Sequence, residues 1–167
     1  MSENYVWYAC YGSNMLKERF MHYIKGGVCR FNGACYRGCN DIADPVDERP
    51  FTIPHELYFG KSSPKWGSGG VAFLNPEKDE SIVTLSRIYT ITREQFDDIQ
   101  AQEGLGWYDE VLELGKLDGI PVKTFTHSSI VVKNRPCDSY IDVIRLGLRE
   151  TYPDMATAEI EQYIKKF

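Results

Sequence analysis

This sequence has no long apolar segment. Its longest run of consecutive apolar or aromatic residues is the seven from Tyr5 to Tyr11, whereas a helix that spans a membrane needs about 20. The first residues, Met-Ser-Glu-Asn, form neither the basic nor the apolar part of a signal peptide. We therefore expect a cytoplasmic protein without a membrane partner.

Patterns for metal binding and thiol catalysis are also scarce. The three histidines are scattered, and five cysteines are an odd number in a chain without an export signal, so we expect reduced thiols. Cys35 and Cys39 have no second ligand pair at zinc spacing, and the spacing places no histidine beside Cys10 or Cys137. We therefore expect no metal site and disfavour a cysteine hydrolase.

A concentration of positive charge is missing as well. The formal net charge is −5, with a pI near 5.2, and the basic residues are spread along the chain, which argues against nucleic acid as the main partner. The 167 residues, 43% hydrophobic and 26% charged, suit a single globular domain over residues 1–167. We expect a small-molecule partner, and the sequence does not indicate an oligomeric state.

The strongest local pattern is a predicted strand followed by a helix. Residues 5–11 are apolar or aromatic without interruption, as in a buried strand. Residues 15–25 place Leu16, Phe20 and Ile24 at helical spacing and end at a glycine pair. A sharp turn must therefore join the two elements.

Gly12, Ser13 and Asn14 form that turn. We expect Gly12 to allow a backbone path that other residues resist, and Ser13 or Asn14 to cap the helix. The N–H groups of the first turn, with the positive helix end behind them, suit a carboxylate, a phosphate or a developing oxyanion. The same residues also occur in ordinary connections, so a site needs a second element.

Glu103 supplies that element. Thr92 and Gln95 form a capping-box pattern that predicts a helix to about residue 103, and Phe96 and Ile99 define its apolar face, on which Glu103 also lies. Burial and the negative helix end both disfavour a charged carboxylate, which raises its pKa and suits a general acid/base. Two alternatives stay open: the helix end frays and exposes Glu103, or an arginine pairs with it.

The remaining pattern predicts more strands than helices. Strands outnumbering helices, with recurrent hairpin signals, favour a mixed α+β fold: a small, mostly antiparallel β-barrel or curled sheet with flanking helices. The other predicted elements are a strand over 28–37 with a bulge at Gly33, an exposed loop over 38–54, strands over 56–60, 71–74 and 82–91, a turn or mobile loop over 61–70, a hairpin over 107–114 and 120–126, a short apolar run over 130–133, a helix that carries residues 140–148, and a last helix over 154–166.

Several motifs, in order along the chain, together resemble the γ-glutamylcyclotransferase family, which includes γ-glutamylamine cyclotransferases and AIG2-like plant proteins. Residues 8–15, Tyr-Ala-Cys-Tyr-Gly-Ser-Asn-Met, resemble the substrate-loop signature of that family. Gln-Glu-Gly at 102–104, followed by Tyr108, resembles its second signature, which carries the catalytic glutamate. Ser-Gly-Gly-Val-Ala at 68–72 and Pro136 shortly before Tyr140 also match.

This resemblance implies a specific reaction. It implies the small mixed barrel of the family and the conversion of a γ-glutamyl compound to 5-oxoproline and a free amine, an acyl transfer within the substrate. Glu103 would be the catalytic acid/base, and no cofactor would be needed because the nucleophile is part of the substrate. The implied substrate-binding residues are Tyr8, Ala9, Cys10, Tyr11, Gly12, Ser13, Asn14, Gly70, Tyr108 and Tyr140.

The sequence departs from the family pattern at two places. Ser86, followed by Arg87, stands in the long strand where a small residue, usually glycine, is expected, and Phe125 stands where some relatives have tyrosine. Both changes leave the turn and the carboxylate intact, so they bear on the substrate more than on the reaction. The leaving amine is not indicated, since the loops over 38–54 and 61–70 carry no recognisable code.

Two other classes of function stay open. A non-catalytic module of the same fold, which binds a γ-glutamyl compound or another carboxylate, would keep the turn but tolerate the loss of Glu103. A phosphate- or nucleotide-handling enzyme would use the turn as a phosphate site, but the sequence lacks Gly-x4-Gly-Lys-Ser/Thr and an obvious carboxylate pair for magnesium.

Overall fold

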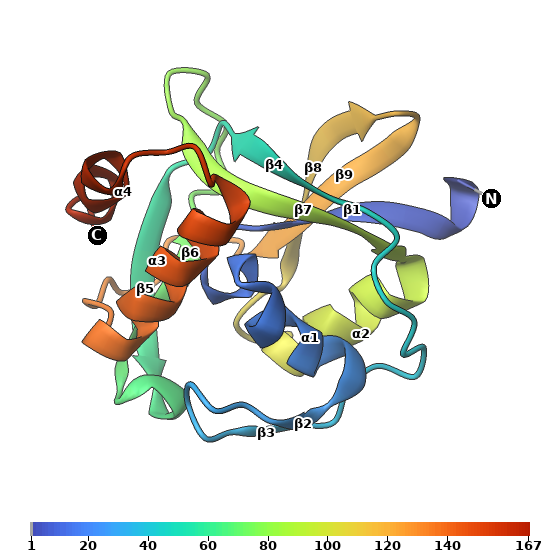
Figure 1. Cartoon of the computed structure of the whole chain (residues 1–167), viewed down its shortest axis with the longest axis horizontal. Helices are drawn as coiled ribbons and strands as arrows, with labels where there is room; N and C mark the ends of the chain where they lie inside the picture. The colour runs from blue at the N-terminus through green and yellow to red at the C-terminus, as the bar shows by residue number, and fades with distance from the viewer. Residues whose placement is uncertain (1) are drawn as a thin grey trace.

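A five-stranded mixed sheet organises the fold. In the computed structural model, which describes residues 2–167, the strand order is β4-β7-β1-β9-β8 (Figure 1). The first strand in sequence is central, antiparallel to β7 and parallel to β9, and the other pairs are antiparallel. The sheet has two open edges, β4 and β8, so it does not close into a barrel, while the mixed, mostly antiparallel arrangement with flanking helices is as predicted. Its strands are β1 (Tyr5–Cys10), β4 (Glu48–Ile53), β7 (Thr84–Thr92), β8 (Glu110–Leu117) and β9 (Ile120–Thr126).

A second hairpin packs beside this sheet. It consists of β5 (Leu57–Ser63) and β6 (Gly69–Leu74), joined through the short helix η3 (Pro64–Trp66). The hydroxyl of Thr126 on β9 both accepts from the N–H of Leu74 and donates to its carbonyl, at 2.9 and 2.8 Å. These bonds fix the hairpin at the end of the sheet where β1 finishes.

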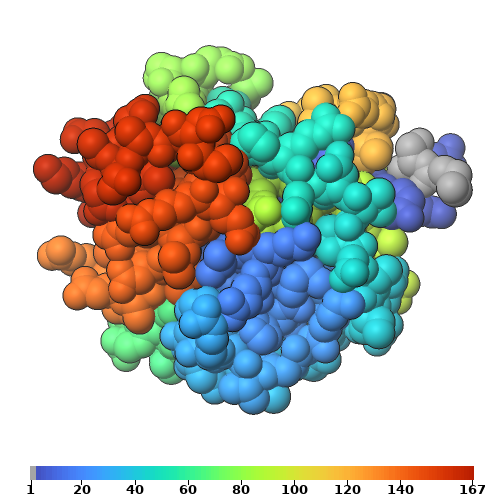
Figure 2. Space-filling view, viewed as in Figure 1, coloured from blue at the N-terminus to red at the C-terminus, as the bar shows by residue number. Residues whose placement is uncertain are grey.

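Helices cover the sheet. The helices α1 and α2 pack against each other, and α2 contacts β1 and β7, while α3 contacts β7 and α4. Figure 2 shows the α1 region, in blue, lying between α3, in orange, and the segment around residues 40–50, in cyan. The helices are η1 (Ser2–Asn4), η2 (Ser13–Met15), α1 (Lys17–Lys25), α2 (Arg93–Glu103), α3 (Asp138–Thr151) and α4 (Thr157–Ile164). Within residues 2–167, no helix has the length and apolar character that crossing a membrane requires.

The expected capping box of α2 is confirmed. The Thr92 hydroxyl accepts from the N–H of Gln95 at 3.1 Å, and the Gln95 side chain accepts from the N–H of Thr92 at 2.9 Å. The amide nitrogen of Gln95 also donates to the carbonyls of Asp41 and Ala43, both at 2.9 Å. The helix therefore starts from a fixed position, which in turn fixes its last residue, Glu103.

The predicted strand over residues 28–37 is wrong. The structure has two-residue strands instead, β2 (Gly27–Val28) and β3 (Cys35–Tyr36), joined by a tight turn. Asn32 accepts from the N–H of Ala34 at 3.0 Å, and Gly33 has a φ of 71°. Asn-Gly is a turn signal, and it outweighs the loose alternation of apolar residues that suggested a bulged strand.

The predicted exposed loop over residues 38–54 is also only partly correct, because β4 occupies its second half. Pro50 lies in this strand and pairs with Arg87. Proline is tolerated there because β4 is an edge strand, where a missing N–H costs no ladder hydrogen bond on the outer side. The proline therefore identifies an edge strand rather than a loop.

Candidate active site

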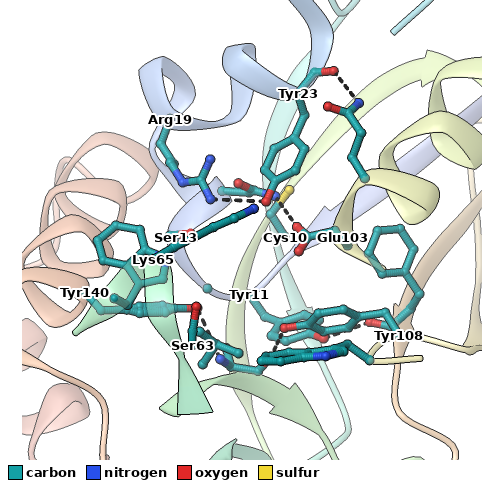
Figure 3. Close-up of a pocket in the computed structure, with 18 of the residues that line it drawn as sticks. Cys10, Tyr11, Ser13, Arg19, Tyr23, Ser63, Lys65, Glu103, Tyr108 and Tyr140 are labelled. Atoms are coloured by element: carbon teal, nitrogen blue, oxygen red, sulfur yellow. Dashed lines mark hydrogen bonds between the residues drawn. The ribbon is translucent and has the colours of Figure 1, made fainter. Parts of the chain in front are cut away.

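A cavity of about 280 Å³ opens where β1 ends in the turn at Gly12 (Figure 3). Its walls come from β1, η2, α1, η3, β6, the end of α2, β9 and the start of α3. The predicted turn and the predicted carboxylate therefore meet in one place. The lining residues are Tyr8, Cys10, Tyr11, Gly12, Ser13, Asn14, Arg19, Tyr23, Ser63, Pro64, Lys65, Trp66, Val71, Ala72, Gln102, Glu103, Trp107, Tyr108, Phe125 and Tyr140.

The residues of β1 reach the cavity alternately. Tyr8 and Cys10 line it, whereas Ala9 does not, since successive side chains of a strand point to opposite faces. Ala9 is completely buried, and its carbonyl accepts from the Thr124 hydroxyl at 2.7 Å. Ala9 is thus separate from the other predicted site residues and contributes to the sheet.

Gly12 has the backbone path that we expected and is also needed for space. Its φ of −122° and ψ of −136° lie outside the α and β regions that most residues occupy. A Cβ atom at this position would lie 2.9 Å from the Cβ of Ala72 and 2.9 Å from the hydroxyl oxygen of Tyr140. The turn therefore packs directly on β6 and α3, and glycine allows that approach.

The prediction that Ser13 or Asn14 caps the first helix is wrong. The short helix η2 intervenes, α1 begins after Leu16, and neither helix start has a side-chain cap. Both side chains line the cavity instead. Within residues 2–167, the backbone N–H groups of Ser13 and Asn14 have no backbone acceptor.

Glu103 lies at the end of α2 with its carboxylate in the cavity. The Asn14 amide donates to Oε1 of Glu103 at 3.3 Å. Burial raises the pKa of the Glu103 carboxyl, although the nearby Arg19 charge, the Tyr23 hydroxyl, the Lys65 charge and the Asn14 hydrogen bond each act to lower it. The raised pKa agrees with the prediction from the apolar helix face.

The two alternatives for Glu103 are now decided. The helix end does not fray into solvent, because the Gln102 side chain donates to the carbonyl of Tyr23 at 2.9 Å and holds α2 against α1. Among the described residues, no arginine or lysine nitrogen comes within 4.0 Å of the Glu103 carboxylate. The carboxylate is thus fixed in the cavity without a direct ion pair.

The three predicted tyrosines Tyr11, Tyr108 and Tyr140 differ in whether the hydroxyl proton is already donated within the protein. The hydroxyl of Tyr11 donates to the carbonyl of Phe125 at 2.8 Å, and that of Tyr108 to the carbonyl of Ala72 at 2.9 Å. The hydroxyl of Tyr140 instead accepts from the N–H of Ala72 at 3.1 Å, and burial raises its pKa to about 12. Tyr11 and Tyr108 therefore form walls, while Tyr140 keeps a proton to donate.

Gly70 is not part of the cavity wall. A Cβ atom there would lie 2.0 Å from the carbonyl oxygen of Asn134, and its N–H donates to the carbonyl of Arg135 at 3.0 Å. The glycine allows a close backbone approach, but the approaching group is residues 134–135 of the same chain and not a ligand.

Arg19 is the principal cavity residue that the sequence reasoning missed. It is 3% exposed, and one of its terminal nitrogens donates to the Tyr23 hydroxyl at 3.1 Å. Within residues 2–167, Nε and the other terminal nitrogen are buried without a hydrogen-bond partner. Arg19 lies three residues after Leu16 and four before Tyr23, on the apolar face of α1. The same pattern identified Glu103 and would have identified Arg19.

The segment over 61–70 adds two more residues that were missed. Trp66 is buried and stacks on Tyr140 with ring centroids 4.9 Å apart. Lys65 is exposed, with Nζ 4.8 Å from the ring centroid of Tyr36. Composition alone suggested a mobile turn here, because serine, proline and glycine surround the tryptophan. The sequence signal for an ordered segment was the large apolar side chain of Trp66 among these turn residues.

The two departures from the family pattern have different places. Phe125 lines the cavity and stacks on Tyr8 at 5.2 Å. Arg87 lies outside it, where it donates to the carbonyl of Met15 at 3.0 Å and pairs with Glu150. Only Phe125 is therefore placed to contact a ligand.

In the part of the chain that the structure describes, no three His, Cys, Asp or Glu side chains form a group that could hold a metal ion.

Comparison with known sequences gives one relevant relative. No family model matches the chain. The chain is 35% identical to histone deacetylase 5 of Arabidopsis thaliana over 202 aligned positions, which cover 96% of this chain and 30% of that protein. The chain thus spans about 30% of the length of this relative, whose name describes the whole protein.

Solved structures identify the fold. A gamma-glutamyl cyclotransferase superposes with a TM-score of 0.62 at 20% identity, covering 98% of this chain and 99% of the other. An uncharacterized protein from Homo sapiens superposes with a TM-score of 0.65 at 20% identity, with the same coverage. A yeast gamma-glutamyl cyclotransferase specific to glutathione gives 0.50 at 12% identity over 98% and 96%. The chain has the γ-glutamylcyclotransferase fold, and the predicted fold class is confirmed.

Proposed function

We propose that this chain cyclises a γ-glutamyl compound to 5-oxoproline and releases the free amine. The observation that carries the proposal is the Glu103 carboxyl, whose pKa is raised by burial and which is joined to the turn through Asn14. The γ-glutamylcyclotransferase fold supports the same reaction.

Glu103 moves the protons in this proposal. The ionised carboxylate takes a proton from the α-ammonium group, and the freed amine attacks the γ-carbonyl carbon to close a five-membered ring. The bond from that carbon to the leaving nitrogen then breaks. The α-nitrogen gives up two protons in all, and both end on the released amine, which leaves as an ammonium ion. No water, cofactor or other reagent is consumed.

Two separate anion sites support this chemistry. The free N–H groups of Ser13 and Asn14 are suited to the oxyanion that develops on the γ-carbonyl oxygen. Arg19, with buried nitrogens that lack a protein partner, is suited to the α-carboxylate of the γ-glutamyl group. The turn alone could not bind both the developing oxyanion and the α-carboxylate equally well. With Arg19 as a second anion site, each group has its own donors.

The test is 5-oxoproline release by the purified protein from a panel of γ-glutamyl amino acids and amines. Glu103→Gln keeps an acceptor for Asn14 but cannot carry protons, so we expect it to lose about 10²- to 10⁴-fold in rate, the usual contribution of positioned acid/base catalysis. Glu113→Gln is the matched control, since Glu113 is an exposed carboxylate on β8 whose Lys123 neighbour is 3.9 Å away. Glu113→Gln should melt at a temperature close to that of the wild type, and Glu103→Gln should melt no lower than the wild type.

Two outcomes would contradict the proposal. Full activity of Glu103→Gln would remove Glu103 from the reaction. A wild type that turns over no member of the panel, while a γ-glutamyl compound still raises its melting temperature, would identify a binding module instead.

A further inference from the structure

The charges of the side chains that line the cavity do not sum to zero. Arg19 and Lys65 are cations, Glu103 is an anion, and they are the charged side chains among its lining residues. Among residues 2–167, no carboxylate oxygen lies within 4.0 Å of the charged nitrogens of Arg19 or Lys65. With Glu103 ionised, the wall therefore carries a net charge of +1. Figure 3 shows Arg19, Tyr23 and Lys65 on one side of Glu103 and the Tyr11 and Tyr108 rings on the other.

Candidate substrates differ in charge. A γ-glutamyl amino acid with a neutral side chain carries two carboxylates and one ammonium group, so its net charge is −1. The γ-glutamyl derivative of a simple monoamine is neutral, and that of a diamine is positive. We propose, on the basis of the proposed function, that the leaving group is an α-amino acid whose carboxylate binds Lys65.

Arg19 and Lys65 differ in burial, and this difference indicates which substrate carboxylate each of them binds. Arg19 is buried among the rings of Tyr23 and Tyr36, at 4.8 and 4.7 Å from its guanidinium carbon. Lys65 is exposed at the rim. The leaving group must depart through the opening, so its carboxylate passes Lys65, while the α-carboxylate of the γ-glutamyl group remains with Arg19.

The short helix that carries Lys65 is fixed in position. Trp66, the next residue, is buried against Tyr140, and the N–H of Ser68 donates to the carbonyl of Ser63 at 2.8 Å. Lys65 is therefore presented by an anchored segment, and its Nζ lies 4.8 Å from the ring centroid of Tyr36. Its ammonium group is available to a ligand at the entrance of the cavity.

Lys65 also acts on Glu103, and the test must separate the two effects. The Lys65 charge lowers the pKa of the Glu103 carboxyl, so its removal changes the turnover of every substrate by the same factor. A contact with the leaving-group carboxylate changes only substrates that have one. The ratio of kcat/KM for two substrates that differ in that carboxylate isolates the contact.

The experiment compares γ-glutamyl-alanine with γ-glutamyl-alaninamide, its neutral analogue of nearly equal size. We expect the wild type to favour the acid by about fivefold in kcat/KM, the effect of one ion pair at an exposed rim. Lys65→Gln should bring the ratio close to one, and Lys65→Glu should favour the amide. Lys78→Gln, which removes an exposed lysine paired with Glu80, should keep the wild-type ratio. The preference should also decrease at high salt.

The outcomes separate this inference from the function on which it rests. Absence of 5-oxoproline from these two compounds and from every other member of the panel overturns the proposed function and the inference with it. Turnover of the amine derivatives of the panel alone overturns only the inference. Turnover of both compounds at equal kcat/KM overturns the inference alone. An acid preference that Lys65→Gln leaves unchanged also overturns it.

Discussion

Two buried arginines lie near the turn at residues 12–15, one in the cavity and one outside it, and they differ in their partners. Arg87, 7% exposed, donates to the Met15 carbonyl and pairs with Glu150 and, at 3.4 Å, with Glu48. Arg19, 3% exposed, has one hydrogen bond, to a tyrosine hydroxyl, and otherwise contacts aromatic rings. The first is satisfied within the protein, and the second is not.

The difference in partners indicates a structural role for Arg87 and a ligand-binding role for Arg19. A buried charge without a carboxylate partner destabilises the folded state, and aromatic faces offset this cost only in part. Arg87 has the contacts of a residue that holds the turn in shape from outside. Arg19 has the contacts of a residue whose partner is a ligand. Variants of the two arginines should therefore have opposite effects on stability and activity.

The largest effect is expected from Arg19→Met. We expect kcat/KM for 5-oxoproline formation to decrease by about 10²- to 10³-fold, because truncating one partner of a buried charged pair costs about 3–4 kcal/mol. The free energy of unfolding without ligand should not decrease, since a desolvated charge is removed. Urea unfolding and initial rates on the same preparation measure both. A marked loss of stability would show that Arg19 is structural, like Arg87.

Arg87→Met should give the opposite pattern. It leaves the Met15 carbonyl without its donor and Glu150 without its partner, so we expect the free energy of unfolding to decrease by about 2 kcal/mol. This value is below the usual 3–5 kcal/mol for breaking a buried pair, because both carboxylates are partly exposed. Urea unfolding measures the change. Unchanged stability, with activity lost as in Arg19→Met, would remove the distinction between the two arginines.

The smallest expected effect is on the pH dependence of the melting temperature, and it comes from Glu103. The pKa of Glu103 is raised in the folded state, so its protonated form favours folding. That contribution is complete below the ordinary value of 4.5 and is lost as the pH rises through the raised pKa. Glu103→Gln removes the dependence, so its melting temperature relative to the wild type should increase between about pH 4 and pH 8. A constant difference would contradict a raised pKa.

The two arginines should shift this pH dependence differently. The charge of Arg19 lowers the pKa of Glu103, whereas Arg87 lies outside the cavity and pairs with Glu150. Arg19→Met should therefore move the acid limb of the kcat/KM profile to higher pH, and Arg87→Met should leave it in place. Equal shifts in both variants would argue for a general change of the cavity.

Local patterns in the sequence predicted several of the elements and residues that form the cavity. The run over 5–11 and the capping box at Thr92 each depend on neighbours in sequence, and both give the expected elements. Glu103 was found because a carboxylate on an apolar helix face conflicts with its surroundings. The cytoplasmic location, the absence of a nucleic-acid partner and the site assignments stay predictions.

The remainder depends on contacts between distant segments. The position of β1 between β7 and β9, and the edge position that accommodates Pro50, follow from strand order, which no local pattern encodes. Ala9 and Gly70 were assigned from a motif, but the strand alternation and the 134–135 segment take them out of the cavity. Lys65 could not be placed, because its position depends on Trp66 stacking on a ring of α3.

The central place of β1 also has a consequence during synthesis. This strand leaves the ribosome before both of its partners, which are Thr84–Thr92 and Ile120–Thr126. At an ordinary rate of about 5–20 residues per second, it waits on the order of ten seconds for the second partner. During that time an apolar strand has no sheet to join, so we expect the nascent chain to depend on chaperones until β9 has emerged.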